Sequence, residues 1–178
     1  MQAIILVGGK SSRMKSKESK VLLKKNGKSF MDYIIDDLKK QGIDDIILKT
    51  EGRKEFDKYK YNKIKKLNNY IPCGTYLISV GDIFSEFDLK KMIKFHNSHT
   101  EPVTALTTNI TIPYGVIEND NWFEKPKKEI SLGLFLVDNV IGHSIHTIRK
   151  AGFKTFKTKG KFVHLTTKED YKKWKKQK

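Results

Sequence analysis

A short apolar run that ends in two glycines constrains the fold more than any other part of this sequence. The run spans residues 3–7, and Gly8 and Gly9 follow it directly. Because the run is rich in β-branched residues and does not alternate with polar ones, it favours a strand buried on both faces of a parallel sheet. The two glycines allow the backbone to turn sharply and to approach a ligand closely.

The loop after these glycines has the composition of a phosphate-binding site. Successive backbone N–H groups in such a turn form a concave anion site. Ser11 and Ser12 add hydroxyl donors, and fixed positive charge comes from Arg13 and Lys20. The alternative is an ordinary glycine turn, since the loop has neither the Gly-Lys-Ser/Thr ending of a P-loop nor a GxGxxG motif. The residues predict a cradle for a phosphate chain at the carboxyl edge of the first strand.

The same stretch resembles the amino-terminal signature of the sugar-phosphate nucleotidyltransferases and of related molybdenum-cofactor guanylyltransferase-like proteins. The shared pattern is a strand, Gly-Gly-x-x-x-Arg-Met, and then Lys-x-Leu-Leu before a Gly-Lys turn at residues 27–28. The resemblance implies that Arg13 contacts the triphosphate and that Lys20 contacts the phosphates of the transition state. It also implies a set of nucleotide-binding residues, namely Leu6, Gly8, Gly9, Ser11, Ser12 and Gly74.

A second candidate site follows the strand predicted at residues 76–80, which ends in Gly81 and Asp82. Open α/β sheets bind ligands at the carboxyl ends of their strands. A carboxylate there can hold magnesium, which prefers one or two carboxylates together with substrate phosphates. The alternative is that Asp82 only ends the turn into the next helix. Residues 82–89 resemble the Gly-Asp segment of the same family, which implies a catalytic and metal-binding role for Asp82.

Segments in the second half of the chain resemble the acceptor-binding elements of this family. Residues 114–116 read Tyr-Gly-Val, residues 124–126 read Glu-Lys-Pro, and residues 132–133 read Leu-Gly. The resemblance implies that Glu124 meets sugar hydroxyls and that Lys125 meets the sugar phosphate, roles that suit a carboxylate and an ammonium group. Alone, Glu-Lys-Pro is a common surface loop. The implied substrate-binding residues are Tyr114, Gly115, Glu124, Lys125 and Gly133.

Two departures from the family pattern concern the metal and the base. Residues 162–171 resemble a segment that carries the family's second metal-binding aspartate, and the register places His164 there. His164 is a metal ligand, a phosphate contact or a histidine at a strand edge. The expected cofactor is Mg²⁺, with Mn²⁺ as the alternative because it accepts nitrogen ligands more readily. The family's base-recognition helix is expected to be absent, because residues 72–75 run straight into the next strand.

Hydrophobic periodicity predicts a single α/β domain over residues 1–178. The resemblance specifies a three-layer, Rossmann-like nucleotide-diphospho-sugar transferase fold with a mainly parallel sheet. Helices are predicted at residues 30–40, 87–99 and 141–150 and from residue 168, where Thr167 and Asp170 form a capping box. Strands are predicted at residues 3–7, 46–50, 64–67, 76–80, 103–107, 133–137, 153–156 and 162–165. A hairpin is predicted around residues 119–121, with a loop at Pro126 and the lysines after it.

Composition narrows the class of protein further. The chain has 178 residues, and its only cysteine, Cys73, excludes an internal disulfide and a multi-cysteine metal site. No apolar run approaches the length of a membrane span and no signal peptide precedes the first strand, so we expect a cytoplasmic protein without a membrane partner. The net charge is +16. A solvated basic face, steering of nucleotide substrates and nucleic-acid binding would each account for that charge.

These observations favour nucleotidyl transfer from a nucleoside triphosphate to a sugar phosphate or a similar phosphorylated metabolite, with release of pyrophosphate. A second hypothesis is a guanylyl- or cytidylyltransferase that acts on a cofactor precursor. A third is a catalytically weak nucleotide- or nucleic-acid-binding relative, although the sequence has no RNA-binding motif and no aromatic stacking platform. Specific nucleic-acid binding is therefore not expected. The sequence does not indicate the base, the acceptor or the oligomeric state.

Overall fold

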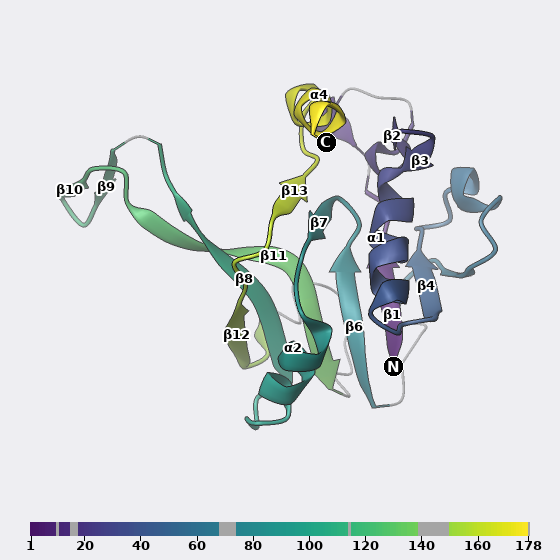
Figure 1. The fold of residues 1–178 in the computed structure, drawn as a ribbon, viewed down its shortest axis with the longest axis horizontal. Helices are drawn as coiled ribbons and strands as arrows, with labels where there is room; N and C mark the ends of the chain where they lie inside the picture. Colours follow the sequence, from purple (N-terminus) through teal and green to yellow (C-terminus); the bar gives the residue numbers. More distant parts are fainter. Residues whose placement is uncertain (10, 15–17, 68–73, 114, 139–149, 178) are drawn as a thin grey trace.

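A seven-stranded sheet forms the centre of the computed structural model, which describes residues 1–9, 11–14, 18–67, 74–113, 115–138 and 150–177. Its strands are β1 (Gln2–Leu6), β4 (Asp45–Lys49), β5 (Asn62–Ile64), β6 (Thr75–Val80), β8 (Val103–Thr111), β11 (Lys127–Asp138) and β12 (Phe153–Lys157). The strand order is β12-β8-β11-β6-β1-β4-β5 (Figure 1). Only β11 runs antiparallel to its neighbours, β6 and β8. The predicted α/β class with a mainly parallel sheet is confirmed.

The first strand, helix and second strand form the predicted βαβ unit. Helix α1 (Phe30–Lys40) begins after Ser29, whose hydroxyl accepts a hydrogen bond from the Asp32 N–H while the Asp32 carboxylate accepts one from the Ser29 N–H. This capping box satisfies backbone groups that the first helical turn leaves free. Gly42 follows the helix with a φ of +87°, a conformation that favours glycine. Local sequence signals therefore position both ends of the helix.

Strand β1 is buried on both faces, as its unalternated sequence predicts. Ala3 and Ile5 belong to one apolar cluster, which includes the buried face of α1 and of helix α2 (Leu89–His96). Ile4 belongs to a second cluster with Ile47 and Ile78 of the neighbouring strands. All three β1 residues have no exposed surface. The sheet therefore separates two apolar layers, with α1 and α2 on one of its faces (Figure 1).

A second hydrogen-bonded ladder brings the carboxyl-terminal segment to the centre of the molecule. Strand β13 (Phe162–His164) pairs with β7 (Ile83–Ser85), which follows Asp82 directly. Helix α4 (Lys168–Lys176) then packs through Trp174, whose ring meets that of Phe30 edge-on at a centroid distance of 5.0 Å. The predicted capping box of Thr167 and Asp170 is present at the start of α4.

Two predictions of secondary structure were wrong. Residues after Pro126 form the start of β11 and not a loop, because residues 127–131 pair with residues 107–111 of β8. The lysines obscure the strand in the sequence pattern, because their charged ends stay exposed while their backbone groups pair with β8. The strand predicted at residues 64–67 lies instead at Asn62–Ile64, where it pairs with β4. The helix predicted at residues 141–150 lies, except for Lys150, outside the described residues.

The two long strands β8 and β11 continue beyond the sheet into a projecting hairpin (Figure 1). Its tip consists of β9 (Val116–Glu118) and β10 (Asn121–Phe123), close to the bounds predicted for this hairpin. Asn119 and Asp120 form the turn with φ values of +48° and +62°, a conformation that Asn and Asp tolerate better than most residues. The remaining short elements are β2 (Lys24–Lys25), β3 (Lys28–Ser29) and three 3₁₀ helices, η1 (Ser12–Met14), η2 (Lys20–Leu22) and η3 (Lys54–Phe56).

A substitution at Gly81 tests how closely the backbones of β1 and β6 approach each other at their carboxyl ends. A Cβ atom at Gly81 would lie 2.8 Å from the Leu6 carbonyl oxygen, whereas one at Gly9 would meet nothing within 4 Å. We expect Gly81→Ala to lower the free energy of unfolding by about 1–3 kcal/mol, because backbone must move to make room. Gly9→Ala is the matched control and should change it by less than about 0.5 kcal/mol. Equal urea midpoints for both variants would show that this approach is not tight.

Candidate active site

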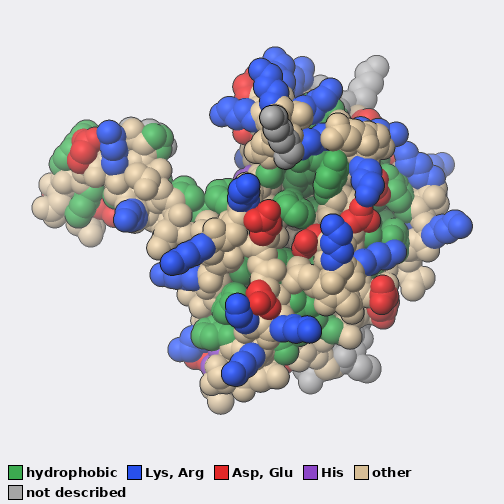
Figure 2. All heavy atoms as spheres, in the orientation of Figure 1, with side chains coloured by type: hydrophobic (Ala, Val, Ile, Leu, Met, Phe, Trp, Pro, Cys, Tyr) green, Lys and Arg blue, Asp and Glu red, His purple; other side chains and the backbone are tan. Residues whose placement is uncertain are grey.

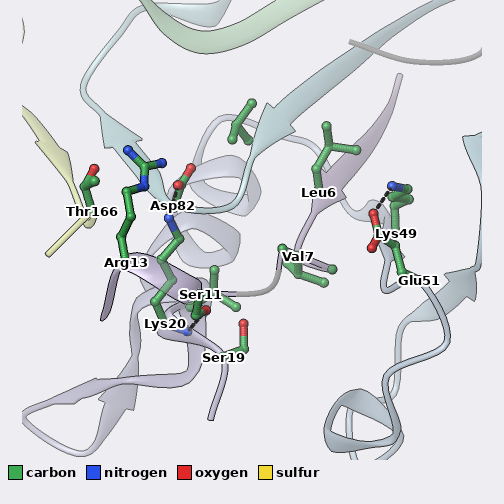
Figure 3. Close-up of a pocket in the computed structure, with 14 residues that line it drawn as sticks. Leu6, Val7, Ser11, Arg13, Ser19, Lys20, Lys49, Glu51, Asp82 and Thr166 are labelled. Carbon is green, nitrogen blue, oxygen red and sulfur yellow. Dashed lines mark hydrogen bonds and ion pairs between the residues drawn. The ribbon is translucent and has the colours of Figure 1, made fainter. Parts of the chain in front are cut away.

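A pocket of about 350 Å³ opens at the carboxyl ends of β1, β4 and β6 (Figure 3). That volume lies within the range of small-molecule sites. In Figure 3, Arg13, Lys20, Asp82 and Thr166 gather at one side, and Lys49 and Glu51 lie at the other. The lining residues are Leu6, Val7, Gly8, Gly9, Ser11, Arg13, Ser19, Lys20, Val21, Lys49, Glu51, Val80, Asp82 and Thr166.

The glycines at the end of β1 allow the chain to turn against β4. The N–H groups of Val7 and Gly8 both donate to the Lys49 carbonyl, at 3.0 and 3.1 Å. A Cβ atom on Gly8 would lie 2.6 Å from Cγ of Glu51. Gly9 has open space around it. A side chain at Gly8 would displace the half-exposed Glu51 side chain, and Gly9 leaves open space beside the backbone.

The loop after the glycines is held by apolar anchors that flank its charged residues. Met14 is buried next to Arg13, and Val21 and Leu22 are buried next to Lys20. Arg13 is exposed on η1, while Lys20 begins η2 with its ammonium group turned into the pocket. The buried neighbours hold both charged side chains in place, with Arg13 exposed and Lys20 largely buried. Arg13 and Lys20 therefore meet at one pocket, as predicted.

Ser11 has a structural contact inside this loop. Its Oγ accepts a hydrogen bond of 2.9 Å from the Lys20 N–H, and its φ is +51°. The hydroxyl thus connects the two ends of the loop after β1 and keeps its own proton available for a further hydrogen bond. Ser11 lines the pocket. Ser12, also predicted to bind the nucleotide, begins η1.

Two charged residues outside the motif secure the same loop, and sequence reasoning missed them. Arg53 donates to the Gly9 carbonyl at 2.5 Å and to the Glu55 carboxylate at 3.2 Å. Glu55 in turn accepts a hydrogen bond of 3.1 Å from the Ser19 N–H. The pair therefore connects the start and the end of the loop. Its segment reads only as a polar, lysine-rich stretch, so the sequence carries no signal for this role.

Asp82 is the centre of the charged side of the pocket. Its Oδ2 forms an ion pair with Nζ of Lys20, and His164 Nε2 lies 3.6 Å from the same oxygen. The Asp82 carbonyl accepts a hydrogen bond of 2.9 Å from the Leu165 N–H. The structure thus brings together three predicted residues, Lys20, Asp82 and His164, from distant parts of the chain. Thr166, which was not predicted, contributes a hydroxyl 3.0 Å from His164 Nε2.

The surroundings keep the Asp82 carboxyl ionised. Burial raises the pKa of this carboxyl, but the adjacent His164 and Lys20 side chains outweigh burial, and the net pKa lies below its usual range. Because folding lowers the pKa of this carboxyl, its ionised form stabilises the folded protein at pH values above the pKa of the unfolded state. That stabilisation is lost as the pH falls through the lower pKa of the folded state. Asp82 is therefore a carboxylate throughout the neutral and mildly acidic range.

Two buried oxygens in the pocket have no hydrogen-bond partner among the described residues. They are Oδ1 of Asp82 and Oγ of Ser19. Buried polar atoms are rarely left unpaired, so such atoms in a cavity indicate a ligand, a water or an ion. Oxygen donors also suit a magnesium ion, which takes one or two carboxylates and completes its shell with phosphates and water. Asp82 therefore fits the expected metal, although no group of three or more metal-binding side chains occurs in the described ranges.

The predicted acceptor residues do not line this pocket. Gly133 lies nearest, because it forms a bulge in β11 with a φ of +65° and a Cβ there would come within 3.0 Å of Val80 Cβ. Gly115, Glu124 and Lys125 belong to the projecting hairpin and its base. Tyr114 lies outside the described residues, as do residues 68–73 before Gly74. Gly74 itself has a φ of +73° and lies outside the pocket lining.

The loop after β1 and the carboxylate after β6 lie together at the carboxyl edge of the sheet, where the sequence resemblance to nucleotidyltransferases predicts them. Residues 3–89 match the family model described as the MobA-like NTP transferase domain. HddC from Yersinia pseudotuberculosis, solved in complex with GMP-PN, superposes with a TM-score of 0.75 at 23% identity. The superposition covers 98% of this chain and 97% of HddC, and it shows a shared fold.

Curated relatives support the same class. The bifunctional protein GlmU of Staphylococcus haemolyticus is 28% identical over 173 residues. Mannose-1-phosphate guanylyltransferase 1 of Arabidopsis thaliana is 26% identical over 180 residues. These matches include 77% and 78% of this chain, but the chain spans only 38% and 50% of the two relatives. The resemblance to nucleotidyltransferases is confirmed. Separately, no helix in the described part of the chain is long and apolar enough to cross a membrane.

The Arg53–Glu55 pair leads to a prediction about the phosphate-binding loop. Arg53→Ala removes the donor to the Gly9 carbonyl, so the loop should open more often without global unfolding. We expect backbone amides of residues 11–20 to exchange with deuterium at least about fivefold faster, which corresponds to roughly 1 kcal/mol of local opening. Amides of β1 should be unaffected. Lys54→Ala, on the exposed neighbour, is the control, and equal exchange in both variants would contradict the proposed role of Arg53.

Proposed function

We propose that this protein transfers a nucleoside monophosphate from a nucleoside triphosphate to a sugar phosphate or a similar phosphorylated metabolite. The observation that carries the proposal is the convergence of Arg13, Lys20 and Asp82 on one pocket at the carboxyl edge of the sheet. The nucleotide would lie along Leu6, Gly8 and Gly9, with its phosphates toward Arg13. The names of the matched family and of the mannose-1-phosphate guanylyltransferase support this assignment.

The reaction needs no covalent intermediate on the protein. An anionic oxygen of the acceptor phosphate forms a bond to the α-phosphorus while the bond from that phosphorus to the β-phosphate bridging oxygen breaks. Pyrophosphate leaves with the electron pair of that bond. The protein's contribution is positioning and neutralisation of charge. Arg13 would bind the β- and γ-phosphates, and Lys20 would bind the oxygens on which charge develops.

Lys20 must change partners for this to occur. In the structure its ammonium group is paired with Asp82, and both side chains are largely buried, with 12% and 15% of their surface exposed. Phosphate oxygens would compete for Lys20. Asp82, with His164 and Thr166 beside it, would then hold a divalent cation in place of the ammonium group. When bound, Mg²⁺ or Mn²⁺ supplies positive charge next to the α-phosphate and the acceptor phosphate.

The acceptor would bind near the strands that carry Glu124 and Lys125. Glu124 and Lys125 suit sugar hydroxyls and a phosphate, and the strands that lead to them leave the sheet at the same edge as the pocket. Gly133 leaves room for backbone beside Val80. We also keep the proposal that Gly74 and Ser12 contact the nucleotide and that Tyr114 and Gly115 contact the acceptor. A cytoplasmic location is likewise a prediction.

A second candidate is transfer of a guanylyl or cytidylyl group to a phosphorylated cofactor precursor. The match of residues 3–89 to the MobA-like domain supports it, as does the position of Glu124 and Lys125 outside the pocket. A catalytically weak nucleotide-binding relative is the third. The three candidates differ in their products, so one assay separates them.

The deciding assay measures pyrophosphate release over a panel of triphosphates and acceptors, with Mg²⁺, with Mn²⁺ and with chelator. We expect turnover with at least one sugar phosphate and none with chelator. Arg13→Ala and Lys20→Ala should each lower kcat/KM by on the order of a hundredfold or more, because each removes charge from the transition state. Lys24→Ala, an exposed lysine outside the pocket, serves as the matched control.

Several outcomes would correct the proposal. Turnover only with a phosphorylated cofactor precursor would establish the second candidate. Triphosphate binding without pyrophosphate release over the whole panel would establish the third. Full activity of both Arg13→Ala and Lys20→Ala would remove the phosphate-binding role of the loop. Circular dichroism of each variant distinguishes lost chemistry from lost fold.

A further inference from the structure

The projecting hairpin carries the most exposed aromatic surface in the described part of the chain. We call residues 115–124 the arm. Ile117 and Trp122 are directly paired across its two strands and are 68% and 64% exposed, and Phe123 is 46% exposed. Paired residues project from the same face of a two-stranded ribbon. The arm therefore presents an apolar face that nothing in its own described chain covers.

The arm is built as an ordered projection and not as a loose loop. A Cβ atom at Gly115 would lie 2.0 Å from the Trp122 ring, so the indole packs closely on this glycine. The ladder of β8 and β11 continues through residues 107–111 and 127–131 to the arm's base. That ladder carries the base of the arm away from the body (Figure 1). Its apolar face is therefore available to another molecule.

Charge indicates the kind of surface that the arm would meet. The arm contains no lysine or arginine, and although Glu118 pairs with Lys128 at its base, Asp120 and Glu124 leave its tip acidic, whereas the whole chain has a net charge of +16. An acidic, aromatic tip is complementary to a basic, aromatic surface. A second copy of this chain, whose net charge is +16, can provide such a surface.

A groove of about 860 Å³ on the body has that character. It lies where β7, β13, α4 and the β2–β3 turn meet, and its lining includes the rings of Phe84, Phe162 and Trp174 with Lys25, Lys159 and Lys161. Phe162 is 37% exposed. One acidic residue, Glu86, also lines the groove and accepts a hydrogen bond from the Lys161 N–H. Figure 2 shows hydrophobic side chains gathered below α4, with lysine or arginine side chains around them.

We propose that the arm of one copy docks into this groove of a second copy, and that the exchange is reciprocal, giving a two-fold dimer. Phe123 follows Trp122 and lies on the other face of the ribbon, so the docking face consists of Ile117 and Trp122. A large side chain can bury about 150–250 Å², so the exposed parts of these two amount to roughly 250 Å² of apolar surface per arm. Two arms provide about 500 Å², and with a similar area of the two grooves that they cover the contact approaches the ~1,200 Å² at which specific interfaces begin.

Sedimentation equilibrium of the full chain tests the proposal. The subunit mass is 20.6 kDa, so a dimer has about twice that mass. We expect a dimer for the unmodified protein at about 10–100 μM and at low salt, with weaker association as salt screens the acidic and basic groups. The arm variant Ile117→Ser with Trp122→Ser, and the groove variant Lys159→Glu with Lys161→Glu, should each raise the dissociation constant at least about tenfold.

Two further samples make the test specific. Lys65→Glu with Lys66→Glu changes the charge equally on exposed lysines that do not line the groove and should leave the dimer intact. A mixture of the arm variant with the groove variant should form a mixed dimer, because one intact arm still meets one intact groove. Circular dichroism shows that each variant is folded.

Three results would overturn the proposal. The unmodified chain could remain a monomer up to about 100 μM. The groove variant could dimerise normally while the arm variant does not, which would indicate contact between two arms. The mixture could fail to associate although each variant alone is a folded monomer. That result would show that the arm of one copy does not bind the groove of the other. No residue changed here belongs to the proposed site, although Gly115 and Glu124 of the arm do, so these results decide the dimer and leave the assay of pyrophosphate release to decide nucleotidyl transfer.

Discussion

The carboxylate of Asp82 joins three segments that are far apart in the chain. Its side chain pairs with Lys20 of the amino-terminal loop and lies beside His164 of β13, while its carbonyl accepts the Leu165 N–H. Removing one partner of a largely buried ion pair leaves the other charge uncompensated, which is costly. This one interaction therefore sets where the loop, the central strand and the carboxyl-terminal segment meet, and so sets the shape of the pocket.

The same pair has a consequence for ligand binding. In the empty protein Lys20 is neutralised by Asp82, and the low pKa of the Asp82 carboxyl keeps the pair charged. A triphosphate must draw Lys20 away and at the same time approach a carboxylate that repels it. A divalent cation on Asp82 would remove both obstacles. The Lys20–Asp82 ion pair therefore fixes the positions of both side chains in the pocket. It also makes productive binding of phosphate dependent on the metal.

Local sequence signals predicted the elements that this site depends on. The unalternated run before Gly8 predicted a doubly buried strand, Ser29 and Asp32 mark the start of α1, and Gly81 with Asp82 marks the end of β6. Contacts that exist only in three dimensions were not predictable. Arg53 and Glu55 acquire their role from Gly9 and Ser19, about forty residues earlier, and nothing in their own segment indicates it. Motif order led to the prediction that Glu124 and Lys125 bind the acceptor, and order alone does not fix distance. Neither residue lines the pocket described here, because both lie at the end of the long β8–β11 ladder.

Binding of a nucleoside triphosphate in the absence of metal tests the central claim most directly, by calorimetry of the unmodified protein and of Asp82→Asn in chelator. If Asp82 holds Lys20 away from phosphate, Asp82→Asn should bind the triphosphate more tightly without metal, by roughly tenfold for an interaction change of about 1.4 kcal/mol. Added Mg²⁺ should strengthen binding to the unmodified protein and have little effect on the variant. Unchanged or weaker metal-free binding by a folded Asp82→Asn variant would contradict the account.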